Sequence, residues 1–269
     1  MSKWQIPPDG GHMESASGIY YQNMTLKEIN DRLETNDLII IPIGSTENHG
    51  LGQNPGEDTF LVTRQAEQIA MATGCTVAQP IWYGSHPNHH LGMPHSIIIP
   101  EETFVAYLRA VMAGFWNAGF RKMILLNGHG QDYVNPTAMH QFGKKYQVPS
   151  IIINVNWWFV IPEHLRDKMH GGPFETPFIH GDECEASFSM ALFPEFIKEE
   201  FFESAKFEPL FPPNHINKSG SALPKEEGPL PFWQQVGASP LEVVSTPEGT
   251  VGDATLADPE KAKGGVNAI

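Results

Sequence analysis

The sequence predicts an α/β protein, built as a three-layer α/β/α sandwich around a mostly parallel central sheet. Two observations predict this class: apolar runs that are continuous instead of alternating, and segments of helical spacing that lie between them. Strand and helix alternate through the first 155 residues. That order implies right-handed crossover connections between parallel strands, although it does not give the order of the strands in the sheet.

The first expected strand is Leu38–Ile43, whose continuous apolar run is typical of a strand covered on both faces. Comparable runs lie at Cys75–Ala78, Met123–Leu126 and Ile151–Val155. These four segments are expected to form the sheet.

The clearest helical pattern runs from Phe104 to Phe115, and Gly119 follows it as the expected C-cap. A weaker pattern between Val62 and Ala70 stops near Gly74. Beyond residue 158 the regular pattern weakens until Glu183–Leu192, which is expected to form a further helix.

The whole chain, residues 1–269, is expected to form a single domain with a proline-rich loop insertion at about 205–235. Lys and Arg number 17 against 31 Asp and Glu, so the formal charge is -14, which argues against nucleic acid and anionic membranes as partners. Because the chain shows no apolar membrane span and no apolar signal region at its start, we expect a cytoplasmic location. Twelve histidines accompany the many carboxylates.

Polar clusters follow two of the expected strands, and a third cluster opens the expected helix at residue 183. The clusters are Gly44-Ser45-Thr46-Glu47-Asn48-His49-Gly50, Asn127-Gly128-His129-Gly130-Gln131-Asp132 and His180-Gly181-Asp182-Glu183-Cys184-Glu185. Taken singly, each has a purely structural explanation in loop polarity, helix capping or the helix dipole. Together with Asp58 they offer carboxylates and imidazoles that suit Zn, Mn or Fe, and five of them would hold two ions that share one carboxylate.

Five ordered blocks of the chain resemble the creatininase (creatinine amidohydrolase) family. They are Pro42–Gly50 with Gly56–Thr59, Tyr83–Ser85 with His90 and Met93-Pro94, Asn127–Gly130, His180–Ser187, and Val251–Ala257. The resemblance covers roughly residues 20 to 265, and ordered blocks are more specific than any one motif. It also implies a homo-oligomer, often a hexamer.

The resemblance implies a dinuclear metal site of two divalent ions, Zn, Mn or Fe. Asp58 would bridge the two ions. Glu47 and His129 would complete one ion, and His49 and Glu185 would complete the other, with a bridging water or hydroxide as the nucleophile.

His180 matches the family position that shuttles a proton to the departing group, a role that suits the titration range of an imidazole. His180 and Glu185 are therefore the expected catalytic residues. Creatininase has a glutamate ligand two residues after the histidine that corresponds to His129, whereas this chain has Gln131, a weaker neutral ligand. For that reason Glu185 is expected to supply the fifth ligand.

Six residues are expected to line the substrate pocket. They are Tyr83, Ser85, His90, His95, Trp157 and Trp158. Many relatives have Pro-Gly-Thr where this chain has Pro94-His95-Ser96, and the larger His95 argues against creatinine itself as the substrate. Ordinary core packing explains the two tryptophans equally well.

The sequence thus predicts a metal-dependent hydrolase that opens a small cyclic substrate by attack of metal-bound hydroxide on a carbonyl. A cyclic amide C–N bond is the family's default target. As an alternative, Pro7–Tyr21 and Trp82–Pro87 resemble a subgroup that opens a cyclic polyol ketone, such as 3-dehydro-scyllo-inosose, by C–C hydrolysis. A non-catalytic metal-binding paralogue and a peptide-processing hydrolase remain open as further alternatives.

Overall fold

The computed structural model describes residues 18–86, 93–131, 133–205 and 249–268. By its internal contacts the chain divides into two compact units. The first unit comprises residues 1–46, 58–86 and 97–157, and the second comprises residues 47–57, 87–96 and 158–269. Each unit is described by itself. The single-domain organisation stays a prediction.

The first unit contains a parallel sheet whose four described strands have the order β2-β1-β3-β4. These strands are β1 (Leu38–Ile43), β2 (Thr76–Val77), β3 (Lys122–Asn127) and β4 (Ile151–Asn156). All four coincide with the apolar runs that predicted them. In the register between β1 and β3, Ile43 lies opposite Asn127, so the segments that follow these two strands leave the sheet at the same edge.

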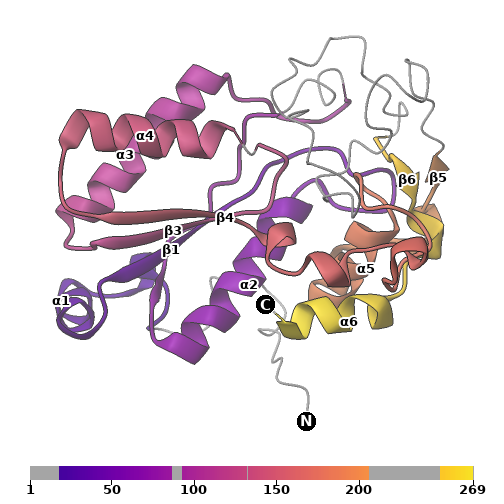
Figure 1. Ribbon diagram of the computed structural model, residues 1–269, viewed down its shortest axis with the longest axis horizontal. Helices are drawn as coiled ribbons and strands as arrows, with labels where there is room; N and C mark the ends of the chain where they lie inside the picture. The colour runs from indigo at the N-terminus through magenta and orange to yellow at the C-terminus, as the bar shows by residue number, and fades with distance from the viewer. Residues whose placement is uncertain (1–17, 87–92, 132, 206–248, 269) are drawn as a thin grey trace. The chain divides into compact units, whose positions relative to one another are not determined.

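Helices cover both faces of this sheet, as Figure 1 shows. They are α1 (Leu26–Thr35), α2 (Glu57–Thr73), α3 (Glu101–Asn117) and α4 (Val134–Tyr146). In Figure 1, α3 and α4 lie on one face of the sheet, and α1 and α2 lie on the other. This arrangement confirms the predicted three-layer α/β/α sandwich with a parallel sheet.

The core between the sheet and α3 follows from the helical spacing in the sequence. Phe104, Leu108 and Met112 recur every four residues and are completely buried, so they form the apolar stripe of an amphipathic helix. They belong to one core cluster with Ile41 and Leu125 of the sheet. At about 25 cal/mol per Å² of apolar surface removed from water, such a stripe supplies most of the stability of a surface helix.

Strand β4 departs from the expectation of strands covered on both faces. It lies at the edge of the four-stranded sheet, and the side chains of Ile151 and Ile153 are 59% and 49% exposed. The isoleucine run therefore predicted a strand correctly, but it did not predict the strand's place at the edge.

The second unit contains α5 (Glu183–Leu192), α6 (Pro259–Ala268) and a small antiparallel pair, β5 (Ser204–Ala205) with β6 (Gly252–Asp253). The ammonium group of Lys261 on α6 donates to the buried carboxylate of Glu183, at the start of α5, over 2.5 Å.

Short 3-10 helices complete the described chain. They are Tyr21–Asn23, Trp157–Phe159, Pro162–His164, Lys168–His170, Pro194–Phe196, Glu199–Phe201 and Ala254–Leu256. The predicted proline-rich insertion lies almost wholly outside the described residues. Among the helices that the structure describes, none has both the length and the apolar character that crossing a membrane requires.

Candidate metal centre

The loop that follows β1 brings two of the predicted ligands together within the second unit. Glu47 and His49 are both buried, and the Nε2 atom of His49 lies 3.6 Å from an oxygen of Glu47. His180, which precedes α5, places its Nδ1 atom 3.6 Å from the same oxygen. The ring centroids of the two histidines are 4.5 Å apart. One carboxylate and two imidazoles therefore share a buried space.

Two further carboxylates of the second unit approach His49. Its Nε2 atom lies 3.6 Å from an oxygen of Glu57 and 3.8 Å from an oxygen of Glu185. These separations exceed the usual 2.7–3.2 Å or so of a hydrogen bond. They are close to the separation of about 3.4 Å that two ligand atoms have when each binds one tetrahedral ion at about 2.1 Å.

Backbone carbonyls orient both imidazoles in the way that is typical of metal-binding histidines. The Nδ1 atom of His49 lies 3.2 Å from the carbonyl oxygen of Glu47, and the Nε2 atom of His180 lies 2.7 Å from that of Asn48. If these nitrogens carry the protons, Nε2 of His49 and Nδ1 of His180 direct their lone pairs toward the carboxylates. In that tautomer, the nitrogen of each ring that faces the carboxylates can serve as a ligand.

The charge of this cluster also fits a bound cation. Three buried carboxylates accompany two imidazoles, so even with both imidazoles protonated the formal charge would be 2 - 3 = -1. Burying such a charge is costly unless opposite charge is supplied. The residues present therefore fit a divalent metal ion.

The start of α5 holds Glu185 in this position. Asp182 caps the helix by accepting hydrogen bonds from the backbone N–H groups of Cys184 and Glu185. Gly181 has a φ of 55°, and a Cβ atom there would lie 2.9 Å from the carbonyl oxygen of His49. Glycine at this position therefore allows the close approach of α5 to the histidine loop.

Burial also shifts the titration of two residues at the start of α5. Burial, with a smaller effect from the nearby charge of Glu183, raises the pKa of Asp182 to about 6 against the lowering effect of the backbone donors. Burial likewise raises the pKa of the Cys184 thiol well above its usual value, and the surrounding carboxylates add to this effect. Cys184 is thus a buried packing residue and not a reactive thiolate.

In the first unit, Asp58 and His129 meet at the carboxyl edge of the sheet. An oxygen of Asp58 lies 2.9 Å from Nδ1 of His129 and accepts a 2.7 Å hydrogen bond from the hydroxyl of Ser45. The ring of His86 packs edge-on against His129, with 4.6 Å between the centroids. Gly128 permits the close approach of Asp58 to the segment that carries His129, because a Cβ atom at residue 128 would lie only 2.4 Å from the carbonyl oxygen of Asp58. Two of the predicted ligands are therefore in direct contact.

Gln131 has a structural role in the first unit. Its Oε1 atom accepts a 2.9 Å hydrogen bond from the backbone N–H of Ser85, and its Nε2 atom lies 3.3 Å from both the carbonyl oxygen of Gly44 and Oδ1 of Asn127. The amide thus ties together the segments that follow three strands. Both ends of the amide are thus used in hydrogen bonds, and the choice of Glu185 as the fifth ligand stays a prediction.

The residues predicted to bind substrate differ widely in exposure. Ser85, Trp157 and Trp158 are buried, whereas Tyr83 is 55% exposed. His95 is exposed and has a φ of 66°, an uncommon conformation for a residue with a side chain. His90 lies outside the described residues. The substrate contacts stay predictions.

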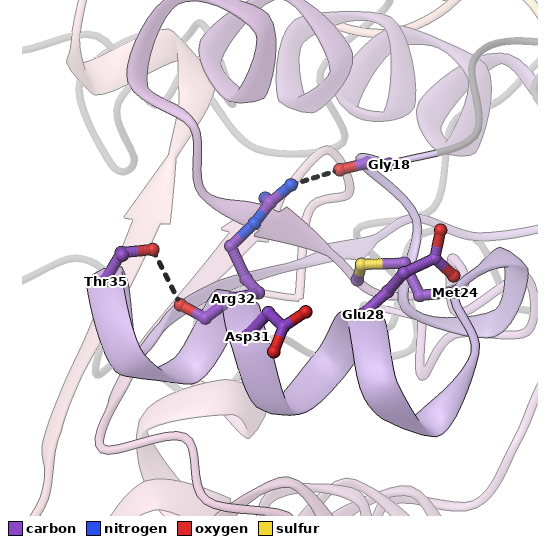
Figure 2. A pocket seen from close by; sticks show the side chains of 6 residues that line it. All are labelled: Gly18, Met24, Glu28, Asp31, Arg32 and Thr35. Atoms are coloured by element: carbon purple, nitrogen blue, oxygen red, sulfur yellow. Dashed lines mark hydrogen bonds between the residues drawn. The ribbon is translucent and has the colours of Figure 1, made fainter.

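A hollow of about 320 Å³ lies along α1 in the first unit, lined by Met24, Glu28, Asp31 and Arg32 among others. Figure 2 shows the Arg32 guanidinium donating to the carbonyl oxygen of Gly18. Arg32 also donates to carbonyls at the C-terminal end of α2, so it joins segments at the amino edge of the sheet. Ligands of open α/β sheets bind at the opposite, carboxyl edge.

Two site residues were not predicted as such. Glu57 stands next to Asp58 in the sequence and begins a helix, so its carboxylate was read only as part of a family block. His86 carried no predicted role beyond lying near the expected pocket. The signal that could have identified Glu57 is its place beside the expected ligand Asp58, inside the Gly56–Thr59 block.

The chain matches a sequence profile described as creatininase, creatinine amidohydrolase, over residues 22–269. It is 56% identical over 257 residues to the 3-dehydro-scyllo-inosose hydrolase of Thermotoga maritima, covering 96% of this chain and 82% of the relative. It is 22% identical over 194 residues to the creatinine amidohydrolase of Pseudomonas putida, covering 68% of this chain and 75% of that protein.

Solved structures of creatininase share the fold. A crystal structure of creatinine amidohydrolase superposes with a TM-score of 0.74 at 18% identity, covering 94% of each chain. A structure titled "Creatininase Mn" has a TM-score of 0.71 at 17% identity and covers 93% of this chain and 96% of the other. At these identities the likeness concerns the fold alone.

Proposed function

The chain belongs to the creatininase family, and from this premise we propose that it hydrolyses a cyclic polyol ketone, 3-dehydro-scyllo-inosose or a close analogue, at a ring carbon–carbon bond. The observation that carries the proposal is the 56% identity, over 96% of the chain, to a hydrolase of that name. The relative that acts on creatinine is only 22% identical over 68% of the chain. The ketone is therefore favoured over the cyclic amide.

The proposed enzyme uses two divalent metal ions, with zinc and manganese as the first candidates. Its proposed ligands are those that the family resemblance implies: Glu47, His49, Asp58, His129 and Glu185. The contact of Asp58 with His129 in the first unit and the approach of Glu47 and Glu185 to His49 in the second support this set. When bound, such ions acidify a water molecule and polarise a carbonyl.

His180 is the proposed proton carrier. Its Nε2 atom is bonded to the carbonyl of Asn48, which fixes the ring, and its Nδ1 atom lies 3.6 Å from Glu47 and 4.0 Å from Glu185. Nδ1 is therefore the ring atom placed to accept and release a proton. In the proposed reaction the hydroxyl of water joins the carbonyl carbon, the adjacent ring bond breaks, and His180 delivers a proton to the departing carbon.

The test combines metal analysis with activity. Purified wild type is expected to hold two divalent ions per chain and to consume the ketone, whereas Glu47→Ala and Asp58→Ala are expected to lose at least one ion and the activity. Unchanged metal content in both variants would overturn the ligand assignment. Metal-loaded protein that consumed neither ketone nor amide would favour a non-catalytic paralogue instead.

The proposed enzyme is a cytoplasmic homo-oligomer, with a hexamer as the form that the family resemblance implies. Light scattering after size exclusion, at protein concentrations spanning the expected dissociation range, gives the mass of the assembly directly. A monomeric mass at all concentrations would contradict this part of the proposal.

A further inference from the structure

We propose that Glu57 is an additional metal ligand, on the ion that His49 binds, and that Ser189 positions it. This inference rests on the metal dependence proposed above. Neither the family blocks nor the predicted five-ligand set gives Glu57 a role. All residues that carry the inference lie in the second unit.

The carboxylate of Glu57 is 1% exposed and has two oxygens in different surroundings. One oxygen, Oε2, lies 3.6 Å from Nε2 of His49. Ligand atoms of His49, Glu57 and Glu185 all lie within 4.8 Å of one another. Glu57 thus approaches the same imidazole nitrogen, at the same separation, as the predicted ligand Glu47.

The other oxygen of Glu57 is anchored. Oε1 accepts a 3.0 Å hydrogen bond from the hydroxyl of Ser189, which lies in the last turn of α5. This bond leaves Oε2 to face the imidazole and restricts the rotation of the carboxylate. A hydrogen bond to the oxygen that does not bind the ion is the usual support of a metal-binding carboxylate.

The loop that carries His49 is also tied to the start of α5. The amide of Gln53 donates to the carbonyl of His49 over 3.1 Å and to that of Gly181 over 2.9 Å. Because Ser189 and Glu185 belong to the same helix, one rigid element presents both the anchor of Glu57 and a second carboxylate. The donor set of His49, Glu57 and Glu185 is therefore pre-organised before an ion binds.

A simpler role for Glu57 would be to stabilise the N-terminus of α2, where an acid is favoured by the helix dipole by about 0.3–1 kcal/mol. An exposed acid would suffice for that purpose, whereas Glu57 is buried and aimed at an imidazole. The two roles also differ in what they predict, because a helix-stabilising acid affects the free energy of unfolding and leaves metal affinity unchanged.

The experiment measures metal affinity and not activity. Apo-protein is titrated with Zn²⁺ in competition with a chromophoric chelator, and with Co²⁺ while the visible absorption spectrum is recorded. Glu57→Gln keeps the size of the side chain and removes the charge. We expect it to weaken binding of one ion by about tenfold to 100-fold and to change the Co²⁺ spectrum, and we expect a smaller loss of the same kind for Ser189→Ala.

Glu183→Gln is the matched control. Glu183 is equally buried in the same unit, but it accepts its hydrogen bonds from the backbone of Glu175 and Thr176 and from Lys261. Its variant should lose stability and retain wild-type metal affinity per folded chain. A comparison at equal folded fraction thus separates loss of a ligand from loss of a buried acid.

The outcomes separate the assignment of Glu57 as a ligand from the metal dependence of the proposed function. If wild type binds metal and Glu57→Gln binds it with equal affinity and an unchanged Co²⁺ spectrum, Glu57 is not a ligand, and the proposed function stands. If wild type binds no metal, the proposed function fails and this inference fails with it. A selective loss in Glu57→Gln, absent from Glu183→Gln, supports the assignment.

Discussion

Replacing Gly128 with alanine is expected to displace Asp58 relative to His129. The added Cβ atom would lie 2.4 Å from the carbonyl oxygen of Asp58 and 2.9 Å from a methyl carbon of Val62, whereas ordinary contact begins at 3.4 Å. Relief of the first contact requires a shift of 3.4 - 2.4 = 1.0 Å. Because a misplacement of about 1 Å can cost about 100-fold in rate, we expect kcat/KM to fall by about that factor.

The assay for Gly128→Ala is turnover of the ketone with metal in excess, together with urea unfolding. Overpacking should lower the free energy of unfolding by about 1–3 kcal/mol. Gly143→Ala on α4 is the control, because no atom lies within 4 Å of its added Cβ. It should raise stability by about 0.5–1 kcal/mol and leave turnover unchanged. Wild-type kcat/KM in Gly128→Ala would refute the reasoning that this glycine sets the Asp58–His129 contact.

Two further predictions concern stability. Gln131→Glu should lower the free energy of unfolding by about 1–3 kcal/mol, because the new carboxylate would face the carbonyl oxygen of Gly44 and Oδ1 of Asn127 without a donor. Wild-type stability of this variant in urea unfolding would contradict the structural role of the amide. The pKa of Asp182 is raised from 3.8 to about 6 in the folded chain, so its contribution to stability is present below about pH 4 and lost as the pH rises through 6. Across this pH range the free energy of unfolding of wild type should therefore fall by about 3 kcal/mol relative to that of Asp182→Asn. A parallel pH dependence of the two unfolding free energies would contradict this prediction.

The sheet could be predicted from the sequence because buried parallel strands have a local signature. Leu38–Ile43 is a continuous apolar run, and its five residues from Ile39 to Ile43 are all buried. An apolar run does not indicate whether a strand has neighbouring strands on both sides, so the edge position of β4 was not predictable from the similar run at Ile151. Strand order depends on crossover connections, which no local pattern specifies.

Helix α1 illustrates a signal that was present but not used. Its apolar residues Leu26, Ile29 and Leu33 have helical spacing, and Thr25 and Glu28 form a capping box that identifies its start. A search for Ser or Thr followed three residues later by Glu would have predicted this helix.

The candidate site was predictable in composition but not in its supporting contacts. Glu47, His49 and His180 stood out as polar residues in ordered family blocks, and the structure brings these three together in the second unit. The bond between Gln131 and Ser85 joins residues 46 positions apart. The bond between Ser189 and Glu57 spans 132 positions. Such contacts arise from tertiary packing, so a single sequence contains no local sign of them.

The most direct test of the central claim is a product analysis in isotopically labelled water. Metal-loaded protein is incubated in parallel with 3-dehydro-scyllo-inosose and with creatinine, and the products are followed by NMR and mass spectrometry. We predict that the ketone alone is consumed, that it yields an open-chain carboxylate with one labelled oxygen, and that chelation of the metal abolishes the reaction. Consumption of creatinine with the ketone untouched would contradict the account.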